Sequence, residues 1–150
     1  MNLNMKPSEL AGVVGVIDPD ANAAGTYTTG WVAMRDWQSL MAVIMAGDLG
    51  ASATLDAKLE QATTSGGASA KDVTGKAITQ LTQAGTDSNK QVLINLRPEE
   101  LDVEGGFDYV RLSMTVAVAT SDSGAVLLGV YPTRGPASDV DAATVDEIVG

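Results

Sequence analysis

Carboxylates dominate the reactive side chains of this chain, because its 150 residues contain no histidine and no cysteine. Without those two residue types the usual nucleophile–base pairs, thiolate chemistry and zinc sites lose their bases and ligands. The densest carboxylate group is Glu99, Glu100, Asp102 and Glu104, and neighbouring carboxylates can divide acid and base roles when burial raises one pKa. A proline and a Gly-Gly pair flank this group, so we predict an exposed rim that faces solvent or a partner. The sequence favours a protein that is not an enzyme, and a hydrolase using this group is the least favoured interpretation.

A second carboxylate pattern is "DPDANAAG", which places Asp18, Asp20 and Asn22 at alternate positions, as at the start of a calcium loop. An EF-hand loop also requires glycine at its sixth position and glutamate at its twelfth. Those positions hold Ala23 and Thr29, which excludes an EF-hand and leaves only a weaker calcium contact as an alternative. We predict no metal site.

The fragment "TGKAIT" at residues 74–79 resembles part of a nucleotide-binding loop. A Walker loop needs glycine five residues before its Gly-Lys pair, and serine or threonine directly after it. Here those positions hold Ala70 and Ala77. The fragment therefore predicts a surface turn, and we predict no bound cofactor.

The charge balance narrows the choice of partner. The chain has 19 acidic and 9 basic residues, for a net charge of −10. Nucleic acids and anionic membranes are bound largely through lysine and arginine, so neither is a predicted partner.

The N-terminal "MNLNMKPSEL" does not have the pattern of a signal peptide, and the longest apolar stretch, "LMAVIMAG", is far shorter than the roughly 20 residues that cross a bilayer.

The elements that would position these residues are short strands. Alternating or wholly apolar runs predict strands at residues 31–34, 40–46, 53–61, 91–96 and 110–118. "TSDSG" predicts a hairpin turn that leads into a return strand at residues 126–131. The run 40–46 is apolar throughout, which is typical of a strand buried on both faces.

Seven or so such strands, without a convincing long helix, predict an all-β fold: a β-sandwich or a jelly-roll-like barrel. Residues 1–27 carry little periodicity and are interpreted as an extended N-terminal arm, with one added edge strand as the alternative. Residues 28–137 form the predicted β-sandwich domain, and the acidic residues 138–150 a C-terminal arm.

Four residues are candidates for a contact surface. Tyr109 and Arg111 lie on the more polar side of the strand 110–118, and arginine is enriched at protein interfaces. Arg134 follows the predicted return strand, and Trp31 begins the first strand of the domain. For the arginine at 111 the alternative is a cross-strand pair with a carboxylate. For both tryptophans, Trp31 and Trp37, the alternative is buried packing.

Five segments together carry a resemblance to a known family: "TGWVAM", "GASATLDAKLEQAT", "GKAITQLTQAG", "LDVEGGFDYVRLSMTVA" and "LLGVYPTRGPA". From about residue 26 to 137 the chain resembles small β-rich, head-associated structural proteins of tailed bacteriophages and prophages. The most characteristic part is an aromatic-Val-Arg strand, a turn, and an apolar strand that ends on proline and a Gly-Pro pair.

The resemblance implies a virion structural role as a decoration, or cement, protein that binds at junctions between major capsid subunits and stabilises the head. It implies self-association, with a trimer favoured, a place on the outer surface of the capsid, and synthesis in the bacterial cytoplasm. Both arms would become ordered on contact with the partner. It supplies no catalytic residue.

Two other interpretations stay open. One is a component of the neck, the head–tail connector or a tail ring, which would be present in few copies at one vertex. The other is a glycan- or calcium-binding β-module, which the sandwich pattern and the surface carboxylates also allow.

Overall fold

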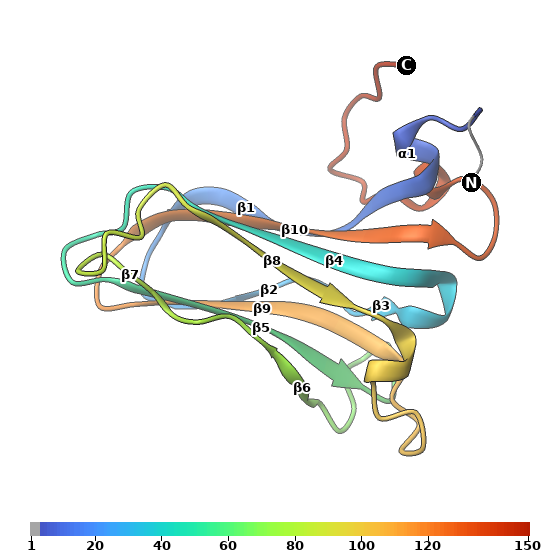
Figure 1. Ribbon diagram of the computed structural model, residues 1–150, viewed down its shortest axis with the longest axis horizontal. Coiled ribbons are helices and arrows are strands. Elements are labelled where there is room, and N and C mark those ends of the chain that lie inside the picture. The colour runs from blue at the N-terminus through green and yellow to red at the C-terminus, as the bar shows by residue number, and fades with distance from the viewer. Residues whose placement is uncertain (1–3) are drawn as a thin grey trace.

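The computed structural model describes residues 4–150, which form two antiparallel β-sheets stacked face to face (Figure 1). Sheet A has the strand order β1 (Ala11–Asn22), β10 (Ser121–Pro132), β4 (Trp37–Ala46) and β8 (Gln91–Leu96). Sheet B has the order β2 (Gly25–Thr28), β9 (Tyr109–Ala117), β5 (Thr54–Ala62) and β6 (Lys71–Ala77), with β3 (Val32–Ala33) beside β9 and β7 (Leu81–Thr82) beside β5. The prediction of an all-β sandwich is confirmed.

Helical structure in the described residues is limited to single turns. These are α1 (Pro7–Leu10), η1 (Met34–Asp36), η2 (Pro98–Glu100) and η3 (Ala137–Val140). The turn η2 begins at a proline, whose fixed φ suits the first helical position. These turns connect or cap strands and add little to the core.

The core lies between the two sheets, and alternation along each strand fills it. In β4 the inward positions Leu40, Ala42 and Ile44 are buried, and in β9 the inward positions Leu112 and Met114 are buried. Full burial of a side chain such as leucine contributes about 1.5–3 kcal/mol. The two inner faces therefore supply most of the hydrophobic stabilisation.

The predicted hairpin at residues 120–124 is wrong. β9 pairs with β2, β3 and β5 in sheet B, whereas β10 pairs with β1 and β4 in sheet A, so the chain crosses between the sheets here. The crossing passes through Val118, which has a φ of 73° and is 69% exposed rather than part of the interior. "TSDSG" predicts a turn because serine and glycine favour turns. Ser121 and Ser123 are buried in β10 instead, and hydrogen bonds satisfy their hydroxyl groups.

The N-terminal segment contributes one edge strand to sheet A. Residues 11–22 form β1, which pairs along its length with β10, and residues 1–3 lie outside the described part. Two register shifts, between Val13 and Gly15 and between Ile17 and Asp20, break the period-two pattern that would have revealed this strand.

The C-terminal segment lies against β1. The Val13 N–H donates to the Asp141 carboxylate (2.7 Å), and the Ala142 N–H donates to the Val13 carbonyl (2.7 Å). These bonds satisfy backbone groups on the side of β1 that faces away from β10. An edge strand whose backbone groups are satisfied is less open to pairing with other chains.

Candidate docking surface

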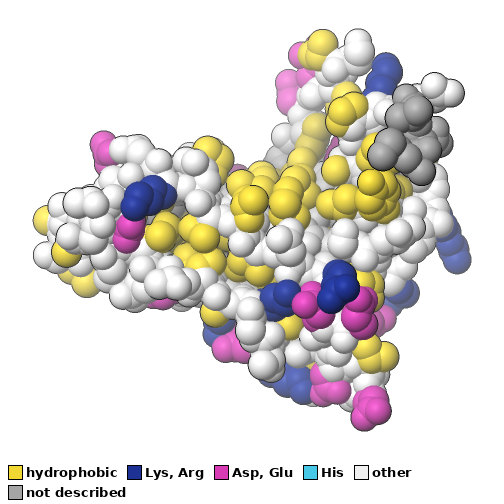
Figure 2. All heavy atoms as spheres, viewed as in Figure 1, with side chains coloured by type: hydrophobic (Ala, Val, Ile, Leu, Met, Phe, Trp, Pro, Cys, Tyr) yellow, Lys and Arg dark blue, Asp and Glu magenta, His cyan; other side chains and the backbone are white. Residues whose placement is uncertain are grey.

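The outer face of sheet A is apolar over most of its area. Alternation and register place nine side chains on it: Val13, Val16, Met41, Val43, Met45, Leu93, Val126, Leu128 and Val130. We call these residues the apolar face. Met45 and Leu93 are 53% and 56% exposed, and the other seven are half-buried. Figure 2 shows hydrophobic side chains gathered across the middle of the molecule, over the strands of sheet A.

The apolar face follows from strands that are apolar at both alternating sets of positions. In β4 and β10 one set fills the core and the other points outward. An antiparallel sheet with one free face normally carries polar residues there. Contiguous exposed apolar patches are typical of interaction sites, so this face is the candidate docking surface.

The outer face of sheet B is built from polar residues. Its outward positions are Thr26 and Thr28 on β2, Thr54, Asp56, Lys58 and Glu60 on β5, and Tyr109, Arg111 and Thr115 on β9; we call these the polar face. Three of its charged side chains form ion pairs, either with each other or with a carboxylate on β6. Arg111 Nε donates to Glu60 Oε2 at 2.6 Å, and Lys58 Nζ lies 2.7 Å from Asp72 Oδ1. Water and these ion pairs can satisfy the polar groups of this face in the isolated chain.

Three of the four predicted contact residues lie at the polar face or beside it. The Arg111 guanidinium lies over the Trp31 ring, 4.6 Å from its centre, besides its bond to Glu60. Tyr109 accepts a hydrogen bond from Arg35 (2.8 Å), and the Arg35 guanidinium also lies 5.0 Å from the centre of the Tyr109 ring. Trp31, Tyr109 and Arg111 therefore contact other residues of the same chain. The cross-strand pair with a carboxylate, which was the alternative for Arg111, is the arrangement found in the structure.

Arg134 lies elsewhere, in the exposed segment after β10. It lines a cleft of about 400 Å³ together with Trp31 and Trp37. The structure thus brings Trp31 near both arginines, but it separates Arg134 from the polar face. Trp37 is 4% exposed and packs on Gly129, where an added Cβ would collide with the indole ring.

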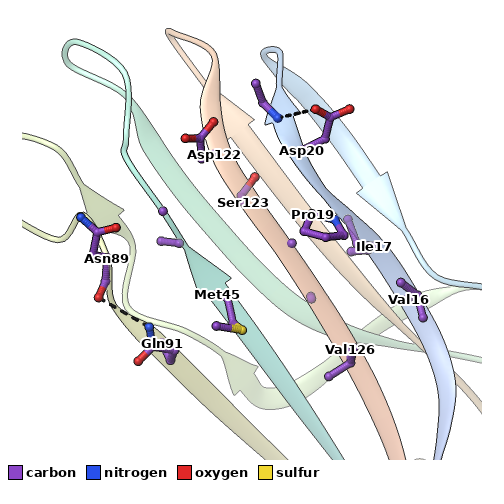
Figure 3. A pocket seen from close by; sticks show the side chains of 15 residues that line it. Val16, Ile17, Pro19, Asp20, Met45, Asn89, Gln91, Asp122, Ser123 and Val126 are labelled. Carbon is purple, nitrogen blue, oxygen red and sulfur yellow. Dashed lines mark hydrogen bonds between the residues drawn. The ribbon is translucent and has the colours of Figure 1, made fainter. Parts of the chain in front are cut away.

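A groove of about 710 Å³ opens at one end of sheet A, where β1, β10 and β4 meet the start of β8 (Figure 3). Val16, Pro19, Met45 and Val126 give it apolar walls. Its middle strand carries Gly124 at an outward position. An added Cβ there would lie 2.8 Å from the Pro19 Cα, so glycine is required for β1 to approach β10 this closely.

Two carboxylates, Asp20 and Asp122, lie at the rim of the groove, and Asn89 and Gln91 lie on the β8 side. Asp20 accepts a hydrogen bond from the Ala21 N–H (2.7 Å). Within residues 4–150 neither carboxylate forms an ion pair, in contrast to Glu60 of the polar face. The rim therefore presents negative charge that no cation of the described chain offsets.

The carboxylate group at residues 99–104 does not form an acid–base pair. Glu100 bonds to Lys76 (2.9 Å) and Asp102 to Lys71 (2.5 Å), so its members are drawn to separate cations. The hydrogen bond from Lys76 lowers the pKa of Glu100, and the hydrogen bond from Lys71 lowers the pKa of Asp102. A general acid needs the opposite shift, so this group has the electrostatics of surface ion pairs.

The alternative calcium contact at residues 18–22 is not assembled either. The Asn22 side chain is buried, and its amide donates to the Ser123 carbonyl at 2.9 Å. Among the residues that the structure describes, no three acidic, histidine or cysteine side chains converge as metal ligands would. The described helices also include none of the length and apolar character needed to cross a membrane.

The apolar face and the groove are what the sequence reasoning missed. The signal was present in "SLMAVIMAG" and "AVLLGVY", which are apolar at both alternating sets of positions. Such a sequence pattern is typical of a strand that is buried on both faces. In the structure one of those faces is the core and the other is open.

Comparison with known proteins gives similarity of backbone architecture only. No protein-family model matches the chain, and no curated protein matches it. Solved structures that match include Broad Bean Stain Virus, with TM-score 0.47 and 9% identity over 91% of this chain and 97% of that chain. Empty top-component particles of Cowpea mosaic virus match with TM-score 0.45 and 9% identity over 89% and 96%. A CBM4 structure matches with TM-score 0.41 and 12% identity over 77% and 66%.

Proposed function

We propose that this chain is a virion structural protein that decorates a bacteriophage head and docks on the major capsid protein through the apolar face. The single observation that carries the proposal is an outer sheet face of nine apolar residues, over whose centre no helix or strand of residues 4–150 lies in Figure 1. The resemblance to head-associated phage proteins supplies the kind of particle. The proposed action is physical: many copies clamp neighbouring subunits and oppose the internal pressure of packaged DNA.

The size of the apolar face suits a protein–protein contact. A sheet of four strands about ten residues long has a face of roughly 600 Å² from the usual strand spacing and rise. A standard stable interface buries about 800 Å² on each partner. Each copy would therefore bind modestly, and repetition over a symmetric shell would multiply the effect.

Chemistry on a substrate is not part of the proposed role. The pKa values of Glu100 and Asp102 are lowered, and each of these carboxylates is held in its own ion pair. The Trp31 ring, which a glycan-binding module would use as a platform, has the Arg111 guanidinium over it. We therefore favour a structural protein over a glycan-binding module.

Co-sedimentation with DNA-filled heads of the phage or prophage that encodes the chain tests this proposal. We expect the wild-type protein to add at a fixed number of copies per capsomer. The double variant Met45→Asp/Leu93→Asp should lose at least tenfold in affinity, because it places charge on an apolar contact. Both residues are exposed, so the variant should keep its fold.

The matched control is Thr26→Asp/Thr28→Asp, which adds the same charge to exposed positions of the polar face. It should bind heads as the wild type does. Failure of the wild type to bind heads, or equal loss in both double variants, would overturn the proposal. A count of only a few copies per virion would assign the chain to the neck or a tail ring instead.

A further inference from the structure

The groove at the end of sheet A combines two properties that the rest of the apolar face lacks. It is a depression, because Gly124 has no side chain between Met45 on β4 and Pro19 on β1. It also has Asp20 and Asp122 at its rim, and neither has an ion-pair partner in residues 4–150. An apolar hollow beside unpaired carboxylates selects an apolar group that carries positive charge nearby.

A second copy of this chain is poorly suited to supply that group. The net charge is −10, and every described lysine and arginine other than Lys6 and Arg134 already takes part in an ion pair. Bringing two copies together at this groove would place unpaired carboxylates near one another. Like charges in juxtaposition disfavour such a pairing.

We propose that the groove binds an extended segment of another protein in which a bulky aliphatic side chain is next to lysine or arginine. The aliphatic side chain contacts Val16, Met45 and Val126, and the cation pairs with Asp20 and Asp122. The amides of Asn89 and Gln91, on the β8 side in Figure 3, can bond to the backbone of the segment. The proposal rests on the proposed docking function and names the chemistry of the partner.

Peptide binding to the isolated full chain, followed by NMR of methyl groups, tests this. The probe is an acetylated, amidated peptide of alternating arginine and leucine, RLRLR, and the control peptide is ELELE. We expect RLRLR to shift the methyl signals of Val16, Met45 and Val126 in a concentration-dependent manner, and ELELE to leave them unchanged. Equal responses to the two peptides, or shifts centred on the polar face, would overturn the proposal.

A pair of variants tests the carboxylates. Asp20→Asn/Asp122→Asn should weaken RLRLR binding about fivefold, since two exposed ion pairs are lost. Asp139→Asn/Asp146→Asn removes the same charge from exposed positions of the C-terminal segment and should leave the affinity unchanged. Equal weakening in both variants would mean that the net charge of the chain determines the affinity. It would overturn the proposal that Asp20 and Asp122 pair with the arginine side chains.

A third arm tests the occupant. If dilution of the protein alone moves the same methyl signals, a second copy fills the groove and the proposal is wrong. If RLRLR fails while heads still bind through the apolar face, only the groove proposal falls. If RLRLR binds at the groove and heads do not bind, the capsid role falls instead.

Discussion

The outward positions of sheet A carry valine, leucine and methionine, whereas those of sheet B carry threonine, lysine, glutamate and arginine. Both sheets bury their inner faces against the same core, so the difference does not arise from folding. In Figure 2 charged side chains lie at the ends and along the lower side of the molecule, and few lie within the hydrophobic area over sheet A. One outer face is satisfied by water and its own ion pairs, and the other gains free energy only when something covers it. Stability and docking should therefore respond to different residues.

The largest expected effect separates the two faces of one strand. Leu127 is fully buried in the core, and its neighbour Leu128 lies on the apolar face. Leu127→Ala should lower the free energy of unfolding by about 3 kcal/mol, as cavity-forming substitutions do. Leu128→Ala should cost less than about 1 kcal/mol in the isolated protein. Urea denaturation measures both, and equal losses would contradict the assignment of the faces.

A smaller effect is expected on the polar face. Arg111→Ala removes both the bond to Glu60 and the contact with Trp31, and should cost about 1 kcal/mol in unfolding free energy. Arg134→Ala, at an exposed position, is the control and should stay within about 0.5 kcal/mol of the wild type. Binding to heads should be unchanged in the arginine 111 variant, and a large loss of binding would move the docking surface to sheet B.

A change in surface chemistry with almost no change in stability is expected from Met45→Lys/Leu93→Lys. These exposed residues should alter the unfolding free energy by less than about 0.5 kcal/mol. The variant should, however, bind less of a fluorescent dye that reports exposed apolar surface. Thr26→Lys/Thr28→Lys on the polar face should bind as much dye as the wild type. Undiminished dye binding in the first variant would show that the apolar face is not the exposed one.

The smallest effect concerns acid. The pKa values of Asp87, Glu100 and Asp102 are lowered in the folded protein, chiefly by a hydrogen bond from the Thr82 N–H, by Lys76 and by Lys71, respectively. A lowered folded-state pKa adds stability above the unfolded-state value, near pH 4, and that stability is lost as the pH falls through the folded-state value. Urea unfolding should therefore give a flat free energy from neutral pH down to about pH 4, then a gradual fall.

Removing two of these carboxylates, each from its own ion pair, checks the cause of the acid sensitivity. Glu100→Gln/Asp102→Asn should make the decline below the ordinary carboxyl range shallower. The same substitutions should leave docking at the apolar face unchanged, since that face has no titratable group. An unchanged acid slope would show that other carboxylates control the response.

The sandwich class and most strands could be predicted from the sequence, because period-two alternation directly encodes which side chains face the core. The strand β9 is an example, with Val110, Leu112, Met114 and Val116 all buried. The partners of each strand could not be predicted in this way. Alternation says nothing about which sheet a strand joins, so the crossing at Val118 looked like a hairpin.

The candidate site was less predictable. Tyr109 and Arg111 were selected because they are large and polar, and ion pairs or hydrogen bonds within the chain engage both of them. The apolar face was hidden, since a sequence does not distinguish a strand covered on both faces from one that is covered on a single face. Figure 1 makes that distinction, because α1 and the C-terminal segment lie over one end of sheet A and no other part of residues 4–150 covers its middle.

The place of β10 in sheet A has a consequence for how the chain folds. β10 is the last strand in the sequence, yet it lies between β1, the first strand, and β4. Sheet A therefore cannot close until β10 has been synthesised, and its central pairings must bring together segments separated by about a hundred residues, such as Ala11 and Val130. Folds dominated by such distant pairings mature slowly, in milliseconds to seconds. During that interval the strands that later form the apolar face are exposed, so expression at low temperature or with chaperones should raise the yield of the native protein.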